Sequence, residues 1–175
     1  EMCIRDSDNA APVTFGGFTA SFASDERFHA LRMPLDQNWK FAVIIPDYEV
    51  RTADARRAMP KEIAVKDSVF TTSHAIAMIE ALRSGSEELL AEACQDVLHE
   101  PCRRKLIKDY DSVRASAKAA GAPAFFISGS GSTMIALTKS ETVAKRFIEL
   151  VRARHPNFAG HVLHAAADGV RVETK

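Results

Sequence analysis

The chain has 175 residues, enough for one domain of ordinary size or for one domain and part of a second. With 46% hydrophobic and 26% charged residues, its composition is that of a folded globular protein and excludes a disordered or coiled-coil chain. The 23 basic and 23 acidic residues give a formal net charge of +0, which argues against nucleic acid or an anionic membrane as the main partner.

No apolar segment approaches the roughly 20 residues that a membrane-spanning helix needs, so we expect no membrane partner. The three cysteines, Cys3, Cys94 and Cys102, are odd in number and show no metal-binding spacing. Unpaired thiols are typical of a reducing compartment. The sequence therefore predicts a soluble, cytoplasmic protein without a metal site among these cysteines.

Residues 1–7 resemble a translated sequencing-adapter read-through rather than the natural start of a protein. They lack the apolar core of a signal peptide, and we exclude them from the fold prediction. We therefore expect that the natural protein extends upstream of residue 8.

Residues 8–38 are predicted to form a short helix, two extended segments and a boundary turn. Asp8 or Asn9 is suited to cap the helix, and a pair of glycines is suited to end it. The extended segments and the turn occupy residues 18–22, 29–33 and 34–38. This part of the chain is interpreted as the remnant of an N-terminal domain.

From residue 39 onward, short apolar runs alternate with segments of helical periodicity. The predicted strands are residues 40–46, 124–127, 134–137 and 160–166. The predicted helices are residues 52–59, 65–82, 87–98, 110–120 and 141–154. Thr52 and Ser140 are placed to cap the first and the last of these helices. The buried face of the second helix is predicted to consist of Val69, Ala75, Ile76, Ile79 and Leu82.

The order of these elements is that of a βαββαβ unit with extra helices in its first crossover. It predicts an α+β fold, a ferredoxin-like two-layer sandwich over residues 39–175. The expected architecture is a four-stranded antiparallel sheet with helices on one face.

The loop between the second and third strands is rich in glycine and hydroxyl groups. It consists of Ser128, Gly129, Ser130, Gly131, Ser132 and Thr133. Glycine reaches backbone angles closed to other residues, so that main-chain N–H groups can face an anion, and hydroxyls add further donors. A phosphate cradle and a plain hairpin turn both fit this loop when it is considered alone.

Four segments occur in an order and spacing that is similar to one enzyme family. They are DNAAP at residues 8–12 with the glycine pair at 16–17, TADARRAMP at 52–60, EPCR at 100–103 with Leu106 and Ile107, and ISGSGST at 127–133. Together they resemble the homoserine kinase family of the GHMP small-molecule kinase superfamily. The resemblance covers essentially the whole chain after residue 7.

The resemblance implies ATP-dependent phosphorylation of the L-homoserine hydroxyl, with Mg²⁺, in threonine biosynthesis. It implies that Arg56 and Arg103 bind the substrate carboxylate, a role suited to guanidinium groups. Thr52 would lie near the reacting hydroxyl, and Asp8 and Asn9 beside the substrate. The loop at residues 128–133 would support the nucleotide phosphates. Because members of the family are commonly dimeric, a homodimer is a further expectation.

The resemblance also implies parts that are missing here, since the family's phosphate loop and acidic magnesium ligand should precede residue 8. Asp6 stands where the family usually has histidine, Cys102 where it often has an aromatic residue, and Arg104 where it often has glycine. Phosphoryl transfer depends on positioning and charge neutralisation, so we expect no measurable kinase turnover from this polypeptide alone.

Other interpretations stay open at this level. Without the resemblance, Arg56 and Arg103 are typical of solvated surface charges, and His74 and His99 of solvent-facing or hydrogen-bonded histidines. A non-catalytic ferredoxin-like module that binds a small ligand or regulates a partner has the same element order. A GHMP kinase for another small alcohol is the nearer alternative.

Overall fold

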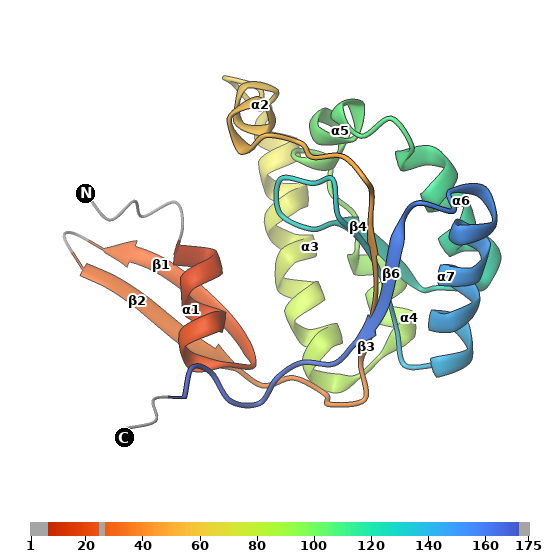
Figure 1. Cartoon of the computed structure of the whole chain (residues 1–175). Coiled ribbons are helices and arrows are strands. Elements are labelled where there is room, and N and C mark those ends of the chain that lie inside the picture. Colours follow the sequence, from red (N-terminus) through yellow and green to blue (C-terminus); the bar gives the residue numbers. More distant parts are fainter. Residues whose placement is uncertain (1–6, 25–26, 172–175) are drawn as a thin grey trace.

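The structure, a computed structural model, describes residues 7–24 and 27–171. Figure 1 shows a small N-terminal unit of one helix and two strands beside a larger unit in which helices surround a sheet. None of the described helices is both long and apolar enough to cross a bilayer. The interpretation of residues 1–7 falls almost wholly outside the described residues, since only Ser7 is included.

The N-terminal unit consists of α1 (Ser7–Phe15), β1 (Phe18–Ser24) and β2 (Arg27–Met33). The two strands pair antiparallel, with Phe18 opposite Met33. Gly16 and Gly17, with φ of 70° and 69°, turn the chain from α1 into β1, as predicted. The predicted cap is displaced: α1 already begins at Ser7, so Asp8 and Asn9 lie inside its first turn.

The C-terminal tail binds this N-terminal unit. The backbone N–H of Gly17 donates to the carbonyl of Ala166 at 2.6 Å, and Val170 N donates to Val13 O at 3.0 Å. A Cβ on Gly169 would lie 2.0 Å from the carbonyl oxygen of Thr14, so this close approach requires glycine. The last strand, predicted over 160–166, is the shorter β6 (Ala159–Leu163), because the chain beyond it pairs with the N-terminal unit instead.

The larger unit contains a four-stranded sheet of β6 and three further strands. These are β3 (Lys40–Ile45), β4 (Ala124–Ile127) and β5 (Met134–Thr138). The strand order is β4-β5-β3-β6 and every pair is antiparallel, with Ala42 of β3 opposite Ala136 on one side and Val162 on the other. This is the strand order of a split βαβ unit, and it confirms the predicted α+β, ferredoxin-like fold.

The helices of this unit are α2 (Thr52–Arg57), α3 (Val65–Ser84), α4 (Glu87–Ala93), α5 (Glu100–Arg103), α6 (Tyr110–Ala120) and α7 (Glu141–Arg154), with a short 3₁₀ turn, η2 (Arg104–Leu106). Ser140 caps α7 as predicted, since its hydroxyl accepts from Val143 N at 3.3 Å. Thr52 is the first helical residue of α2, and Arg51 takes the cap position without a side-chain bond, so the predicted cap at Thr52 is wrong. The helix predicted over 87–98 ends at Ala93.

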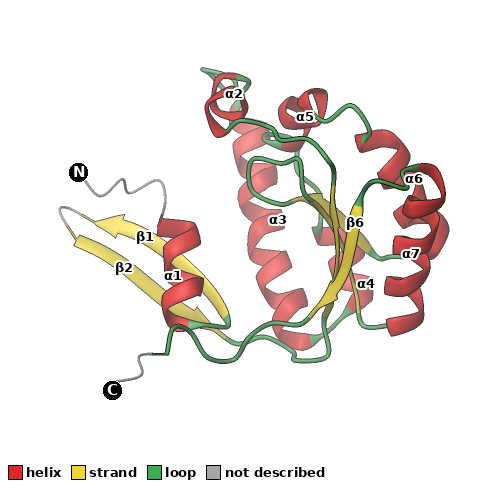
Figure 2. Cartoon of the chain, in the orientation of Figure 1, coloured by secondary structure: helices red, strands yellow, loops and turns green. Residues whose placement is uncertain are grey.

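Helices cover both faces of the sheet (Figure 2). Helices α6 and α7 pack on one face, where Ala42 and Ile44 meet Val113, Phe147 and Val151. Helices α3 and α4 pack on the other face, in a second cluster built from Trp39, Ala81, Leu82, Leu90 and Leu137. The expectation of helices on one face therefore holds for α6 and α7 and is wrong for α3 and α4.

The predicted buried face of α3 is also only partly correct. Leu82 is buried, but the side chains of Val69 and Ile76 are 63% and 64% exposed. Apolar residues lie around much of this helix, so its periodicity alone did not identify the side that packs on the sheet.

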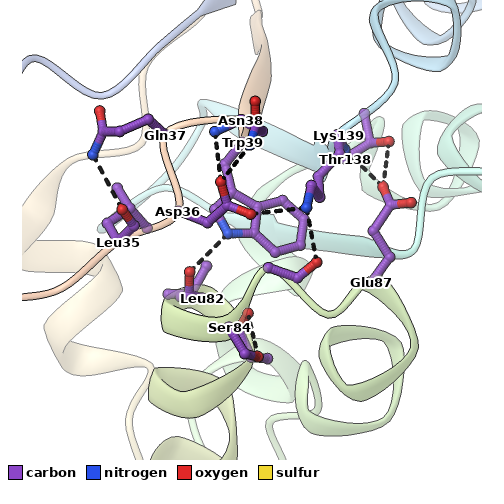
Figure 3. Close-up of polar contacts among 12 residues, drawn as sticks. Leu35, Asp36, Gln37, Asn38, Trp39, Leu82, Ser84, Glu87, Thr138 and Lys139 are labelled. Atoms are coloured by element: carbon purple, nitrogen blue, oxygen red, sulfur yellow. Dashed lines mark hydrogen bonds and ion pairs between the residues drawn. The ribbon is translucent and has the colours of Figure 1, made fainter.

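A network of paired polar groups lies where the chain enters β3 (Figure 3). Lys139 Nζ lies 2.8 Å from Asp36 Oδ2 and donates to Gly85 O at 3.2 Å, while Trp39 Nε1 donates to Leu82 O at 2.9 Å. We call Asp36, Trp39, Lys139 and their partners the junction. It fixes the segment that enters β3 against the end of α3.

Candidate active site

The loop at residues 128–133 forms a closed turn between β4 and β5, as the sequence predicts. Ser128 N donates to Thr133 O at 2.9 Å, and Gly131 N donates to Ser128 O at 3.0 Å. Gly129 and Gly131 have φ of 57° and 85°. A Cβ on Gly131 would lie 2.8 Å from Cδ1 of Ile107, whereas a Cβ on Gly129 would meet nothing within 4 Å. Gly131 is therefore packed into the core, and Gly129 lies at the exposed tip.

The hydroxyls of the loop have different surroundings. Ser132 is 6% exposed and its Oγ donates to the carbonyl of Tyr48, in the segment that follows β3. Ser130 Oγ donates to Gly131 O at 3.3 Å. Ser132 thus fixes the loop to the segment that follows β3, while the more exposed residues Ser130 and Gly129 are those that a ligand can approach.

Arg103 connects this loop to α5. Its Nη1 donates to the carbonyl of Gly129 at 2.7 Å. Its Nε is buried and has no hydrogen-bond partner among the described residues. One N–H group of the guanidinium therefore fixes Arg103 on the loop.

The position of Arg103 depends on α5, a helix of only four residues. A helix of this length does not form alone, so outside contacts must hold it. The carboxylate of Asp96 accepts from the backbone N–H groups of Leu98, His99 and Glu100 at 2.7, 3.0 and 3.0 Å. Burial alone would raise the pKa of Asp96, but hydrogen bonds from the side chain and backbone of His99, and from the other N–H groups, lower that pKa well below its usual value.

A second contact holds α5 on α6. The hydroxyl of Tyr110 donates to Glu100 Oε1. Burial, together with this hydrogen bond to a carboxylate, raises the pKa of Tyr110, so the phenol stays protonated and remains a donor. Asp96 and Glu100 together orient the single turn that carries Arg103.

Arg103 lines a cavity of about 460 Å³ bounded by α3, α5 and β4. We call it the α3–α5 cavity. Apolar walls are provided by Met78, Ala93, Phe126 and Ile127, and polar groups by Thr71 and Glu100. A second cavity, of about 550 Å³, lies on another side of the loop, beside Gly131, Ser132 and Thr133 and the segment at residues 45–50. The glycine-rich loop therefore borders two cavities.

Three other predicted substrate residues, Thr52, Arg56 and Asn9, lie outside the lining of the α3–α5 cavity. Thr52 and Arg56 are exposed on α2. Figure 1 shows α2 and α5 at the same end of the sheet as the glycine-rich loop. Asn9 is exposed on α1, in the N-terminal unit, and the side chain of Asp8 is outside the described set. Convergence of these residues on one substrate stays a prediction.

Sequence analysis missed Thr71 and Asp96 as site residues. Asp96 had a signal, since an aspartate just before a short helix is typical of a cap. Thr71 had none, because a threonine within a helix gives no indication of what it faces. His74 fits its predicted role as a hydrogen-bonded histidine: its Nδ1 lies 2.9 Å from Phe70 O, and its ring stacks on Phe70 with centroids 3.7 Å apart.

Within residues 7–24 and 27–171, no group of three or more His, Cys, Asp or Glu side chains is placed to hold a metal ion. These residues therefore do not fit a complete site for the magnesium that the family resemblance implies.

Comparison with known proteins identifies the family. Residues 78–157 match the sequence model described as GHMP kinases C terminal. The chain contains a GHMP kinase C-terminal domain. The matched range includes β4, the glycine-rich loop, β5 and α5 with Arg103.

Several proteins similar to this chain are named homoserine kinase. The homoserine kinase of Microchaete diplosiphon is 40% identical over 134 residues, which cover 77% of this chain and 44% of the relative. The homoserine kinase of Aquifex aeolicus is 34% identical over 170 residues, which cover 94% of this chain and 57% of the relative. The crystal structure of homoserine kinase from Cytophaga hutchinsonii superposes with a TM-score of 0.84 at 30% identity. The superposition covers 93% of this chain and 53% of that structure. The chain spans about half the length of the relatives that it matches.

Proposed function

We propose that this chain is part of a homoserine kinase, an enzyme that transfers the γ-phosphoryl group of ATP to the side-chain hydroxyl of L-homoserine. The observation that carries the proposal is Arg103, which lines a cavity and whose guanidinium group is bonded to the glycine-rich loop. This arrangement places an anion-binding group next to a loop of the type that approaches phosphates. The names of the relatives at 34–40% identity support homoserine as the alcohol.

The match to the Aquifex aeolicus relative covers 94% of the chain and so extends upstream of residue 40. A free-standing regulatory module would begin near β3 and would have no use for the segment around α1. The extent of this match therefore supports a kinase over the non-catalytic module.

In the proposed reaction, Arg103 binds the substrate carboxylate and Arg56 contributes a second positive charge. Guanidinium groups stay protonated at any physiological pH and bind carboxylates through paired N–H groups. Thr52 and Asn9 act near the substrate, and the loop at residues 128–133 stabilises the nucleotide phosphates. Rate enhancement in phosphoryl transfer comes mainly from such positioning and charge stabilisation.

GHMP kinases use ATP, but the described residues do not fit a magnesium site, so we derive no step through the metal. The family's phosphate loop is also expected upstream of residue 8. For these two reasons we propose that this polypeptide alone does not turn over ATP. An ADP-release assay on the purified chain tests this point, and turnover well above a no-enzyme blank would contradict it.

Binding of L-homoserine, measured by calorimetry on the whole chain, tests the proposal without requiring turnover. We expect Arg103→Met and Arg56→Met each to weaken binding at least tenfold, because an unpaired carboxylate loses a charge-assisted hydrogen bond. The matched controls are Arg104→Met and Arg57→Met, which alter the neighbouring arginines. Equal effects of the Arg103 and Arg104 changes would contradict the assigned role.

A further inference from the structure

A smaller cavity, of about 200 Å³, lies beside the candidate active site and is lined by two arginines. It shares Glu100 and the segment at residues 94–96 with the α3–α5 cavity. The rest of its lining comes from α5, η2, α6 and β4, and includes Arg104 and Arg114. We call it the α5–α6 cavity. Among the described residues, neither Arg103 nor the glycine-rich loop lines it, so it is separate from the proposed substrate residues.

The two arginines are accessible and have donors to spare. Arg104 is exposed, and its side chain makes no hydrogen bond or ion pair within residues 7–24 and 27–171. The side chain of Arg114 is 56% exposed, and its Nη1 lies 3.9 Å from Glu100 Oε1, beyond hydrogen-bond distance. A guanidinium group has several N–H donors and stays charged. Both groups are therefore open to a ligand that enters from solvent.

The acids of this cavity are already engaged. The carboxylate of Asp96 accepts from three backbone N–H groups, and Glu100 Oε1 accepts from the Tyr110 hydroxyl. Burial and the Glu100 carboxylate raise the pKa of Tyr110, and the positive charges of Arg114 and Arg104 oppose that rise. Both arginines thus act on the same place, the Tyr110–Glu100 pair, where two positive charges face one carboxylate. That place favours an anion.

The size and shape of the cavity restrict the anion. A volume of about 200 Å³ is smaller than the roughly 300–1,000 Å³ of sites for drug-sized ligands, so the ligand is small. A phosphate group offers three acceptor oxygens and a charge of about −1.5 to −2, which suits two guanidinium groups on separate elements. Val97, Pro101 and Phe125 provide apolar surface for the carbon part of an ester.

We infer that the α5–α6 cavity is a second anion site, in which Arg104 and Arg114 bind the phosphate group of a small phosphate monoester or free phosphate. The inference goes beyond the proposed function, which uses neither arginine. The family motif does not lead to it either, because Arg104 stands where the family often has glycine.

An NMR titration of the whole chain with inorganic phosphate, at constant ionic strength, tests this inference. Backbone amide shifts locate the site and give its dissociation constant. We expect the shifts to change around Glu100, Arg104 and Arg114. Arg104→Met and Arg114→Met should each weaken binding about tenfold, because each removes charge-assisted hydrogen bonds to the phosphate.

Three further variants separate the cavity from the general charge of the surface. Lys105→Met and Lys118→Met each remove one positive charge from an exposed position outside the cavity, and should leave phosphate binding nearly unchanged. Val97→Trp, at a site of the lining that is 41% exposed, fills the cavity without altering its charge and should abolish binding. Equal losses for Lys105→Met and Arg104→Met would overturn the inference.

A comparison of probes tests the class of the ligand. Ethyl phosphate should bind with the same dependence on Arg104 as inorganic phosphate, and tighter binding of the ester would support contact with the apolar walls. Acetate carries a single charge on two oxygens and should bind more weakly. Acetate that binds as tightly as phosphate would contradict a site for phosphate.

The failures of the inference and of the proposed function can be told apart. Arg104→Met should lose phosphate and keep L-homoserine, whereas Arg103→Met should show the reverse. Phosphate that binds as predicted to a chain that does not bind L-homoserine would uphold the inference and contradict the proposed function. Absence of phosphate binding, or shifts confined to residues 128–133, would overturn the inference and leave the proposed function intact.

Discussion

The junction and the α3–α5 cavity are both places where polar side chains lie among apolar ones, but their hydrogen bonding differs. At the junction, the charged and polar groups find partners: Lys139 pairs with Asp36, and the Trp39 indole pairs with Leu82 O (Figure 3). Beside the cavity, Arg103 Nε and Thr71 Oγ1 are buried without a hydrogen-bond partner among the residues that the structure describes. Buried polar groups with partners stabilise a fold, whereas buried polar groups without partners destabilise it.

The largest effect on stability is expected at the junction, from Trp39→Ala. Trp39 is 1% exposed and belongs to the cluster between the sheet and α3. Because loss of a buried aromatic leaves a cavity, we expect the free energy of unfolding to fall by about 3–5 kcal/mol. Urea denaturation measures this change. Phe28→Ala, at a site 45% exposed, is the control, and a loss of equal size there would contradict the assigned core.

A medium effect is expected where the glycine-rich loop meets the core. Gly131→Ala combines a positive φ with a Cβ 2.8 Å from Ile107 Cδ1, and should lower the free energy of unfolding by about 1–3 kcal/mol. Gly129→Ala has a similar φ but open space around its Cβ, so its loss should be smaller. Chemical denaturation of both variants gives the comparison. If Gly129→Ala were the more harmful change, the packing described for the loop would be wrong.

Asp96→Ala tests the support of the cavity, because Asp96 orients α5 and Arg103 but is not proposed to contact the ligand. Loss of a capping side chain lowers the free energy of unfolding by about 1 kcal/mol. Binding of L-homoserine should weaken more than this change in stability explains, since Arg103 loses its orientation. Asp96→Asn keeps an acceptor and should restore part of the binding. An Asp96→Ala variant with unaltered affinity would show that α5 does not depend on its cap.

The same residue predicts a pH dependence of stability. The pKa of Asp96 is lower in the folded state than its ordinary value of 3.8, so the folded state binds fewer protons than the unfolded state near that pH. Its contribution is complete at neutral pH and is lost as the pH falls below about 4. Unfolding measured from pH 6 to pH 2.5 should show a shallower decline for Asp96→Asn than for the wild-type chain. Parallel curves would refute the low pKa.

The smallest effect is expected from Lys139→Met at the junction. The ion pair with Asp36 is partly exposed, and such pairs contribute little and are screened by salt. The melting temperature should fall slightly at low ionic strength, and the difference from wild type should shrink in 1 M NaCl. A large, salt-independent loss would indicate that Lys139 acts through packing rather than charge.

Much of the fold could be predicted from the sequence, because local signals marked it clearly. The strands on either side of the glycine-rich loop, helices α6 and α7, and the Ser140 cap follow from periodicity, glycine positions and capping residues. The side of the sheet on which α3 packs could not be predicted, since a helix with apolar residues around much of its surface carries no such information. The length of β6 depended on the tail pairing with Gly17 and Val13, a contact between the two ends of the chain.

The candidate site was predictable only where family motifs contain it. Arg103 and the loop residues carry such motifs, and the structure joins them through the bond to Gly129 O. Thr71 lies about 30 positions before Arg103, and only the packing of α3 beside β4 and α5 brings both residues to one cavity. The predicted roles of Thr52, Arg56, Asp8 and Asn9 stay predictions: Thr52, Arg56 and Asn9 do not line that cavity, and the side chain of Asp8 lies outside the described set.

A crystal structure of this chain grown with L-homoserine tests the central claim most directly. We predict that the carboxylate of the amino acid lies within hydrogen-bond distance of the Arg103 guanidinium group. L-homoserine bound elsewhere on the chain, without contact to Arg103, would contradict the account.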